Sequence, residues 1–201
     1  MKTYLKFVSQ TDESELKAFY DAMSEEKKES VDKLNNTKTA KQRIVADGVL
    51  RKALFETEGI PPEEIVLKYN ESGKPYAENS DVKFSVSHSK DAVICAVSDN
   101  EIGVDIEKIR DVRFKVAERF ATEEEIAYIG GNTERFFEIW TLKEAYFKCI
   151  GTGLDASIKN VSFKINGKEA ECSEKGFKCS VISVADGYCC SICEKLSDAG
   201  F

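Results

Sequence analysis

Features that would assign this chain of 201 residues to a membrane, to nucleic acid or to the secretory route are missing from its sequence. No apolar run reaches about 18 residues, so no segment is expected to span a membrane. The N-terminal segment MKTYLKFVSQ alternates like a β-strand and lacks the apolar core of a signal peptide. The formal net charge is −7, whereas non-specific nucleic-acid binding needs a basic surface. These observations favour a cytoplasmic globular protein that contacts neither membrane nor nucleic acid.

Histidine and paired cysteine motifs are also scarce. His88 is the single histidine, and the seven cysteines are odd in number and scattered. One C-x-x-C motif, Cys190 to Cys193, has no second pair to complete a zinc site. In the strand that this segment predicts, positions 190 and 193 would point to opposite faces. We therefore expect reduced, largely buried cysteines rather than a disulfide framework or a zinc centre.

The predicted elements occur in the same order twice. The first half reads as a strand, helices opening at Asp12 and Ser24, a long helix from Thr37 to Gly59, and strands beyond residue 82. The second half reads as a strand, helices and three short strands near the C-terminus. The pattern predicts an α+β fold, a pseudo-two-fold pair of similar halves (1–100 and 101–201). Each half is expected to be a small antiparallel sheet packed with helices.

A strand with an acidic face opens the second half. In the sequence IGVDIE, Ile102, Val104 and Ile106 share one face, so Asp105 and Glu107 point to the other. Two carboxylates at this spacing lie about 7 Å apart and repel each other unless a cation lies between them. A solvated outer face explains an isolated D-x-E equally well. The glycine at position 103 tips the choice towards a site, because it lets a ligand or another backbone approach closely.

A second group of charged residues lies on the helix predicted from Thr133 to Gly151. Lys143 falls inside its apolar arc, where a lysine is unusual. Glu144 and Lys148 lie four residues apart on one side of the helix, about 6 Å of rise. The ordinary interpretation is a lysine whose ammonium reaches solvent and a surface Glu–Lys pair. The acidic strand upstream favours a functional one.

Together these residues predict magnesium-dependent phosphate chemistry. If the helix packs over the strand, Asp105, Glu107 and Glu144 meet, and all-oxygen ligation suits Mg²⁺. Cationic groups for further phosphates are available at Lys143, Lys148, Lys74, Arg43 and His88. Mg²⁺ flanked by lysines and a histidine is typical of phosphoryl or pyrophosphate-bond chemistry.

Three segments, FSVSHS, IGVDIE and WTLKEAYFKCIGTGL, resemble in order and spacing the signatures of 4′-phosphopantetheinyl transferases. The length and the additional GKP and KQR segments resemble the long, surfactin-synthetase-activating (Sfp) type. The resemblance covers roughly residues 1–190. It implies the family's fold and a Mg²⁺-dependent enzyme of holo-[acyl-carrier-protein] synthase activity. Such an enzyme transfers the 4′-phosphopantetheine arm of coenzyme A to a serine of an apo acyl or peptidyl carrier protein and releases 3′,5′-ADP.

The resemblance also implies residue roles. The implied metal ligands are Asp105, Glu107 and Glu144. The implied coenzyme A contacts are Arg43, Lys74, Pro75, Ser87, His88 and Lys143, with Lys27 or Lys28 near the 3′-phosphate. The implied catalytic residues are Glu144 as base towards the carrier serine, Lys148 as acid towards the leaving phosphate, and His88.

The sequence departs from the family at one place, where Ser85 replaces a frequent asparagine. We expect a monomer whose carrier protein docks near the junction of the halves, with Phe114, Lys115, Phe120 and Tyr128 as candidate contacts. Two alternatives remain open. One is a Mg²⁺-dependent phosphohydrolase of a nucleotide-like diphosphate, and the other is an inactive homologue that binds carrier proteins or coenzyme A.

Overall fold

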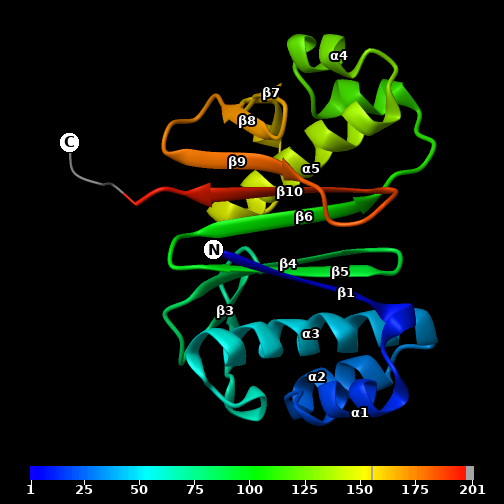
Figure 1. Cartoon of the computed structure of the whole chain (residues 1–201), viewed down its shortest axis with the longest axis vertical. Helices are drawn as coiled ribbons and strands as arrows, with labels where there is room; N and C mark the ends of the chain where they lie inside the picture. The colour runs from blue at the N-terminus through cyan, green and yellow to red at the C-terminus, as the bar shows by residue number, and fades with distance from the viewer. Residues whose placement is uncertain (155, 198–201) are drawn as a thin grey trace.

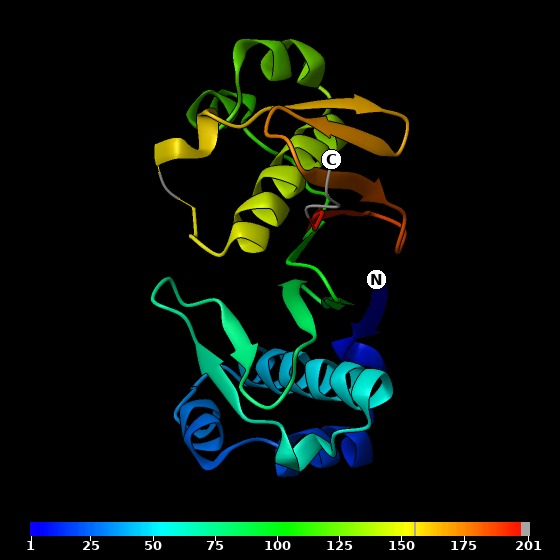
Figure 2. The same cartoon turned by 90° about the vertical axis from the view of Figure 1, so that its left-hand side faces the viewer.

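The computed structural model describes residues 1–154 and 156–197 and shows an α+β fold with antiparallel sheets, as predicted. Two sheets, each with helices, are stacked along the long axis, and the chain passes between them in the segment that joins β5 to β6 (Figures 1 and 2). The first sheet has the strand order β1-β5-β4 and the second β6-β10-β9-β8-β7. The halves share a plan, a long helix against an antiparallel sheet, but differ in strand number.

The bounds of the first half are β1 Lys2–Phe7, α1 Glu13–Asp21, α2 Glu25–Asp32, α3 Thr37–Glu58, β2 Leu67–Tyr69, β3 Pro75–Ala77, β4 Lys83–Ser89 and β5 Ala92–Ser98. Those of the second half are β6 Ile102–Lys108, α4 Glu123–Ile129, α5 Thr133–Ile150, β7 Phe163–Asn166, β8 Glu169–Cys172, β9 Phe177–Ile182 and β10 Tyr188–Lys195. Short 3₁₀ turns lie at Val8–Gln10, Pro62–Glu64, Phe114–Arg119 and Ala156–Lys159.

Both long helices begin and end where the sequence predicts. The Asn36 side chain accepts from the first amides of α3, and Gly59 ends the helix with φ of 75°. Asn132 caps α5 in the same way, and Gly151 ends it with φ of 72°. Glycine is suited to this left-handed position because it has no Cβ to clash. The caps fix the register of α5, and with it the faces on which Glu144 and Lys148 lie.

Helix α5 packs closely over β6 and β10. A Cβ built on Gly103 of β6 would lie 1.9 Å from the carbonyl oxygen of Ala145 and 2.4 Å from the amide nitrogen of Cys149. The glycine expected to permit a close approach therefore admits the backbone of α5. This approach brings the charged side of the helix onto the acidic face of the strand.

A ladder of serine hydroxyls joins the two sheets where β4 runs parallel to β6. Ser85, Ser87 and Ser89 accept hydrogen bonds from the backbone amides of the three β6 residues Val104, Ile106 and Lys108, over 3.1, 3.3 and 3.2 Å. We call these three hydroxyls and their amides the serine ladder. Because the amides at this edge of β6 bind side chains of β4, the sheets meet in a fixed register.

Two short strands were missed from the sequence. The stretch around Gly73–Lys74–Pro75, which has turn residues and no β pattern, leads into β3, and β3 pairs with β2. Proline at the first position of an edge strand costs no ladder hydrogen bond. Strand β8 is short and rich in glutamate, so it shows little β pattern, but it is held between β7 and β9.

The cysteines in the structure are all free, and most are buried. As predicted for a strand, Cys190 and Cys193 lie on opposite faces of β10 and belong to different hydrophobic clusters. Within residues 1–154 and 156–197, no helix has both the length and the apolar character that crossing a membrane requires.

Candidate active site

The serine ladder holds the two carboxylates of β6. The Ser87 hydroxyl donates to Asp105 Oδ1 over 2.7 Å, and the Ser89 hydroxyl donates to Glu107 Oε2 over 2.7 Å. Asp105 is only 4% exposed, whereas Glu107 is half-buried and also accepts from Arg110 over 3.0 Å. The acidic face predicted from the D-x-E spacing is therefore a covered site at the junction of the halves.

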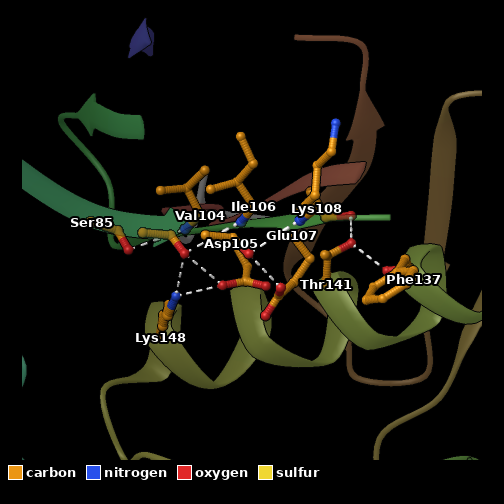
Figure 3. A network of polar contacts seen from close by, with 12 residues as sticks. Ser85, Val104, Asp105, Ile106, Glu107, Lys108, Phe137, Thr141 and Lys148 are labelled. Atoms are coloured by element: carbon orange, nitrogen blue, oxygen red, sulfur yellow. Dashed lines mark hydrogen bonds and ion pairs between the residues drawn. The ribbon is translucent and has the colours of Figure 1, made fainter. Parts of the chain in front are cut away.

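Lys148 reaches this group from α5 (Figure 3). Its ammonium donates to Asp105 Oδ1 over 2.6 Å and to the Ser87 hydroxyl over 2.9 Å. The ordinary interpretation, a surface pair between Glu144 and Lys148, does not hold, because the ion-pair partner of Lys148 is Asp105 on β6. Figure 3 shows Val104 and Ile106 on the opposite side of the strand from Asp105 and Glu107.

Glu144 is the third carboxylate of the group. Burial, followed by the negative charges of Asp105 and Glu107, raises its pKa to about 7, and the positive charge of Lys148 opposes this rise. Burial also raises the pKa of Asp105, against the opposing effects of Lys148 and Ser87. Three mutually repelling carboxylates with a single lysine among them form a site that a cation would stabilise.

Three further observations bear on whether a metal fits these carboxylates. Asp105 Oδ2 is buried and has no hydrogen-bond partner, although buried carboxylate oxygens are normally satisfied. All the donors are oxygens, which suits Mg²⁺. In the part of the chain that the structure describes, no three His, Cys, Asp or Glu side chains already meet in ligating geometry. The chemistry of these residues fits a hard cation. In the structure, the ammonium of Lys148 binds Asp105, the first of the three carboxylates.

Two cavities lie near this group, and Lys148 lines one of them. The Arg43 cavity, about 370 Å³, lies in the first half and is lined by Arg43, Lys27, His88 and Tyr69, together with Pro75 and Val86. The Lys148 cavity, about 220 Å³, is lined by Lys148 and Phe147 of α5, the Ser72–Lys74 turn, and again Pro75 and Val86. Shared walls at Pro75 and Val86 make the two cavities neighbours along one path.

His88 and Arg43 supply the polar end of that path. Loss of solvation, followed by the positive charges of Lys148 and Arg43, lowers the pKa of His88. Lys27 lines the same cavity and pairs with buried Asp47, whereas Lys28 pairs with Glu25 on the helix surface. The structure thus places Lys27, and not Lys28, on this cavity.

Lys143 is not part of the site. Its side chain is 0% exposed, its ammonium lies 2.8 Å from Glu125 of α4, and it donates to the carbonyl oxygens of Ile158 and Val161. Burial lowers its pKa, and the hydrogen bond and charge of Glu125 oppose that effect. The expected contact between Lys143 and a coenzyme A phosphate is therefore wrong, because all of its donors point into the core.

Lys74 also differs from expectation. Lys74 lines the Lys148 cavity, but its ammonium binds Glu101 over 2.7 Å and the Cys149 carbonyl over 2.9 Å. The last carbonyls of a helix attract cations, so Lys74 holds the turn before β3 against the end of α5. Its charge is engaged within the protein.

Two residues that contact side chains of the site or of its cavities were not found from the sequence. Ser89, which holds Glu107, and Asp47, which pairs with both Lys27 and Arg51, were overlooked. A signal for the serines did exist, since S-x-S-x-S and G-x-D-x-E have the same two-residue period. It becomes informative only once β4 and β6 are known to be neighbours.

Comparison with known proteins shows similarity in both halves. Residues 10–100 match the family model described as 4′-phosphopantetheinyl transferase, N-terminal, and residues 101–193 match that of the 4′-phosphopantetheinyl transferase superfamily. The 4′-phosphopantetheinyl transferase gsp of Aneurinibacillus migulanus is 33% identical over 184 residues, which cover 87% of this chain and 77% of that protein. The 4′-phosphopantetheinyl transferase Sfp of Bacillus subtilis strain 168 is 27% identical over 160 residues, covering 77% and 71%.

Among solved structures, holo-[acyl-carrier-protein] synthase of Thermotoga maritima is 24% identical with a TM-score of 0.41, over 48% of this chain and 63% of that chain. The two family models abut at residues 100 and 101, where the chain passes from the first sheet to the second. The resemblance seen in the three sequence signatures is confirmed: this chain belongs to the 4′-phosphopantetheinyl transferase superfamily and is similar to its Sfp-type members.

Proposed function

We propose that this enzyme transfers the 4′-phosphopantetheine arm of coenzyme A to a serine of an apo carrier protein and releases 3′,5′-ADP. The observation that carries the proposal is the shared wall at Pro75 and Val86 between the Arg43 and Lys148 cavities. A ligand with phosphates towards one end and a reacting phosphate at the other could lie along this path.

The Arg43 cavity suits the adenylate end of coenzyme A. Arg43 and Lys27 offer positive charge to a 3′-phosphate, and His88 can donate to it once protonated. Tyr69 is exposed and lies directly opposite Pro75 across the β2–β3 pair, so the two form a flat apolar wall suited to a base.

Asp105, Glu107 and Glu144 are the residues that would hold Mg²⁺. The unpartnered Asp105 Oδ2 and the mutual repulsion of the three carboxylates support this part of the proposal. When bound, the ion supplies positive charge that stabilises the negative charge developing on the pyrophosphate.

The remaining steps use side chains of this chain. Glu144, with its pKa raised to about 7, is suited to accept the proton of the carrier serine hydroxyl. That oxygen forms a bond to the β-phosphorus of coenzyme A, and the bond from this phosphorus to the bridging oxygen of the pyrophosphate breaks. Lys148, which lines its cavity from α5, is placed to donate a proton to the departing phosphate. The hydrophobic wall at Phe147 helps to exclude water.

For carrier docking, the surface around Phe114 and Lys115 is favoured, and both residues belong to the set expected from sequence. Phe114, Val116 and Ile126 are exposed apolar side chains, and Lys115 is exposed beside them. Phe120 is wrong as a contact, because it is 2% exposed and packs edge-on against core aromatic rings. We propose that this apolar and basic surface receives an acidic carrier protein, that the enzyme acts as a monomer, and that it is cytoplasmic, which the free cysteines support.

Incubation of the protein with coenzyme A, Mg²⁺ and an apo carrier protein tests the proposal, with Asp105→Asn as the matched inactive control. A carrier mass increase of one phosphopantetheine, dependent on the metal and absent in the control, supports it. Coenzyme A consumed without carrier would instead indicate a phosphohydrolase. Binding of coenzyme A without turnover would indicate a non-catalytic binding protein, and either result refutes the transferase proposal.

A further inference from the structure

We infer that Ser87 and Ser89 are positioning residues that aim the carboxylates of Asp105 and Glu107 at the metal. The inference rests on the proposed function, because it concerns the metal site proposed there. It assigns Ser87 a role that differs from the expected coenzyme A contact, since its hydroxyl already donates its one proton and accepts two hydrogen bonds.

The contacts of Ser87 show how it would act. Its hydroxyl accepts from the Ile106 amide over 3.3 Å and from the Lys148 ammonium over 2.9 Å, and its single proton goes to Asp105 Oδ1 over 2.7 Å. Lys148 binds the same carboxylate oxygen over 2.6 Å. Both partners therefore occupy Oδ1, and the other oxygen, Oδ2, is the buried atom left without a partner.

This arrangement fixes a torsion that is otherwise soft. The terminal torsion of an aspartate has a broad, two-fold energy profile, so burial alone does not choose which oxygen faces the site. A hydroxyl held by a backbone amide of the same strand makes that choice, because the amide cannot move without the strand. Outer partners of this kind orient metal ligands and contribute to their affinity.

Ser89 repeats the arrangement one step along both strands. Its hydroxyl accepts from the Lys108 amide over 3.2 Å and donates to Glu107 Oε2 over 2.7 Å. Each carboxylate has a second, cationic partner, Arg110 for Glu107 and Lys148 for Asp105. Glu107 is half-buried, so water can replace a lost hydroxyl there more readily than at Asp105, which is only 4% exposed. We therefore expect Ser89 to matter less than Ser87 for metal affinity.

Ser85 provides the matched control within the same ladder. Its hydroxyl accepts from the Val104 amide over 3.1 Å, as the other two do from their amides. The residue of β6 that corresponds to Asp105 and Glu107 at this step is Gly103, which has no side chain. Loss of the Ser85 hydroxyl removes the same backbone contact between the sheets and no carboxylate contact.

The experiment compares Ser85→Ala, Ser87→Ala and Ser89→Ala in the full chain. Binding of Mn²⁺, followed by its electron paramagnetic resonance signal, and of Mg²⁺, followed by calorimetry, is measured without substrates, alongside the thermal midpoint of each variant. Ser87→Ala is expected to weaken metal binding by about 10–100-fold. Ser89→Ala is expected to weaken metal binding less, and Ser85→Ala is expected to leave metal binding unchanged. All three variants should have a lower thermal midpoint, because each loses a contact between the sheets.

Equal metal affinity in all three variants, or an equal loss in all three, would overturn the positioning role. If the serines served only to join the two sheets, loss of a serine that binds a carboxylate would affect metal binding no more than loss of Ser85. If Ser87→Ala does not fold, the comparison of Ser89→Ala with Ser85→Ala decides the question in the same way. A wild-type protein that binds neither metal would refute the metal site itself. A different result, in which the wild type binds metal and the three variants bind it with the same affinity, refutes the positioning role and leaves the metal site standing.

Discussion

The ammonium of Lys143 is enclosed by the carboxylate of Glu125, 2.8 Å away, and by two backbone carbonyls, with no exposed surface. Glu125 in turn accepts from the amides of Thr122 and Phe163 over 2.8 and 2.9 Å. Substitution by methionine keeps the apolar stem but leaves the Glu125 carboxylate buried without its cation. Breaking such a pair from one side costs about 3–5 kcal/mol. For a chain of this length that corresponds to a fall of roughly 6–20 °C in the thermal midpoint.

Urea unfolding and calorimetric titration of coenzyme A check this expectation together. Lys143→Met should lower the free energy of unfolding by the amount above and leave coenzyme A affinity unchanged at a temperature where the variant is folded. Adding Glu125→Gln should restore a large part of the stability, because both charges are then removed. The reasoning fails if Lys143→Met unfolds like the wild type but binds coenzyme A at least about tenfold more weakly, as a phosphate contact would.

Three further predictions follow from the site. Lys148→Ala should lower the rate of single-turnover transfer by about 10²–10⁴-fold with little change in coenzyme A affinity. It should also cost about 1–3 kcal/mol of stability, because Asp105 stays buried without its cation. Weaker coenzyme A binding at an unchanged rate would instead show that Lys148 binds a phosphate and is not the acid. Gly103→Ala should cost about 1–3 kcal/mol or more in urea unfolding, since its Cβ would meet the backbone of α5; wild-type stability would show that α5 moves freely. Arg43→Ala should raise the KM for coenzyme A about 10–100-fold but not that for dephospho-coenzyme A; equal losses for both would place the 3′-phosphate elsewhere.

Local signals in the sequence were sufficient for the long helices and for the acidic strand. Asn36 with Gly59, and Asn132 with Gly151, mark helix ends by capping chemistry that acts within a few residues. The two-residue period of IGVDIE placed its carboxylates on one face, as the structure confirms. Such features depend on neighbours in sequence, and the sequence therefore determines them well.

Sequence periodicity predicts the face of an element on which a side chain lies, but not the residue that it contacts. This explains why the contacts of Lys143 and Lys148 were not predicted. The helical wheel correctly placed Lys143 on the apolar side of α5, but its partner Glu125 comes from another helix. The ordinary interpretation paired Lys148 with Glu144 on its own helix, whereas its ion-pair partner is Asp105 on β6. Each of these pairings depends on how separate elements pack. The contact between β4 and β6, which belong to different sheets, could not be predicted from the sequence for the same reason.

Alternate amides of a strand point to opposite edges, so β6 reports on two different motions. The amides of Val104, Ile106 and Lys108 face the serine hydroxyls of β4, and those of the intervening residues face β10. Hydrogen exchange at the first set measures how often the two halves part, and exchange at the second measures how often the C-terminal sheet itself opens. Exchange rates of the amides of β6, measured residue by residue, therefore distinguish transient opening of the junction between the halves from opening of the C-terminal sheet.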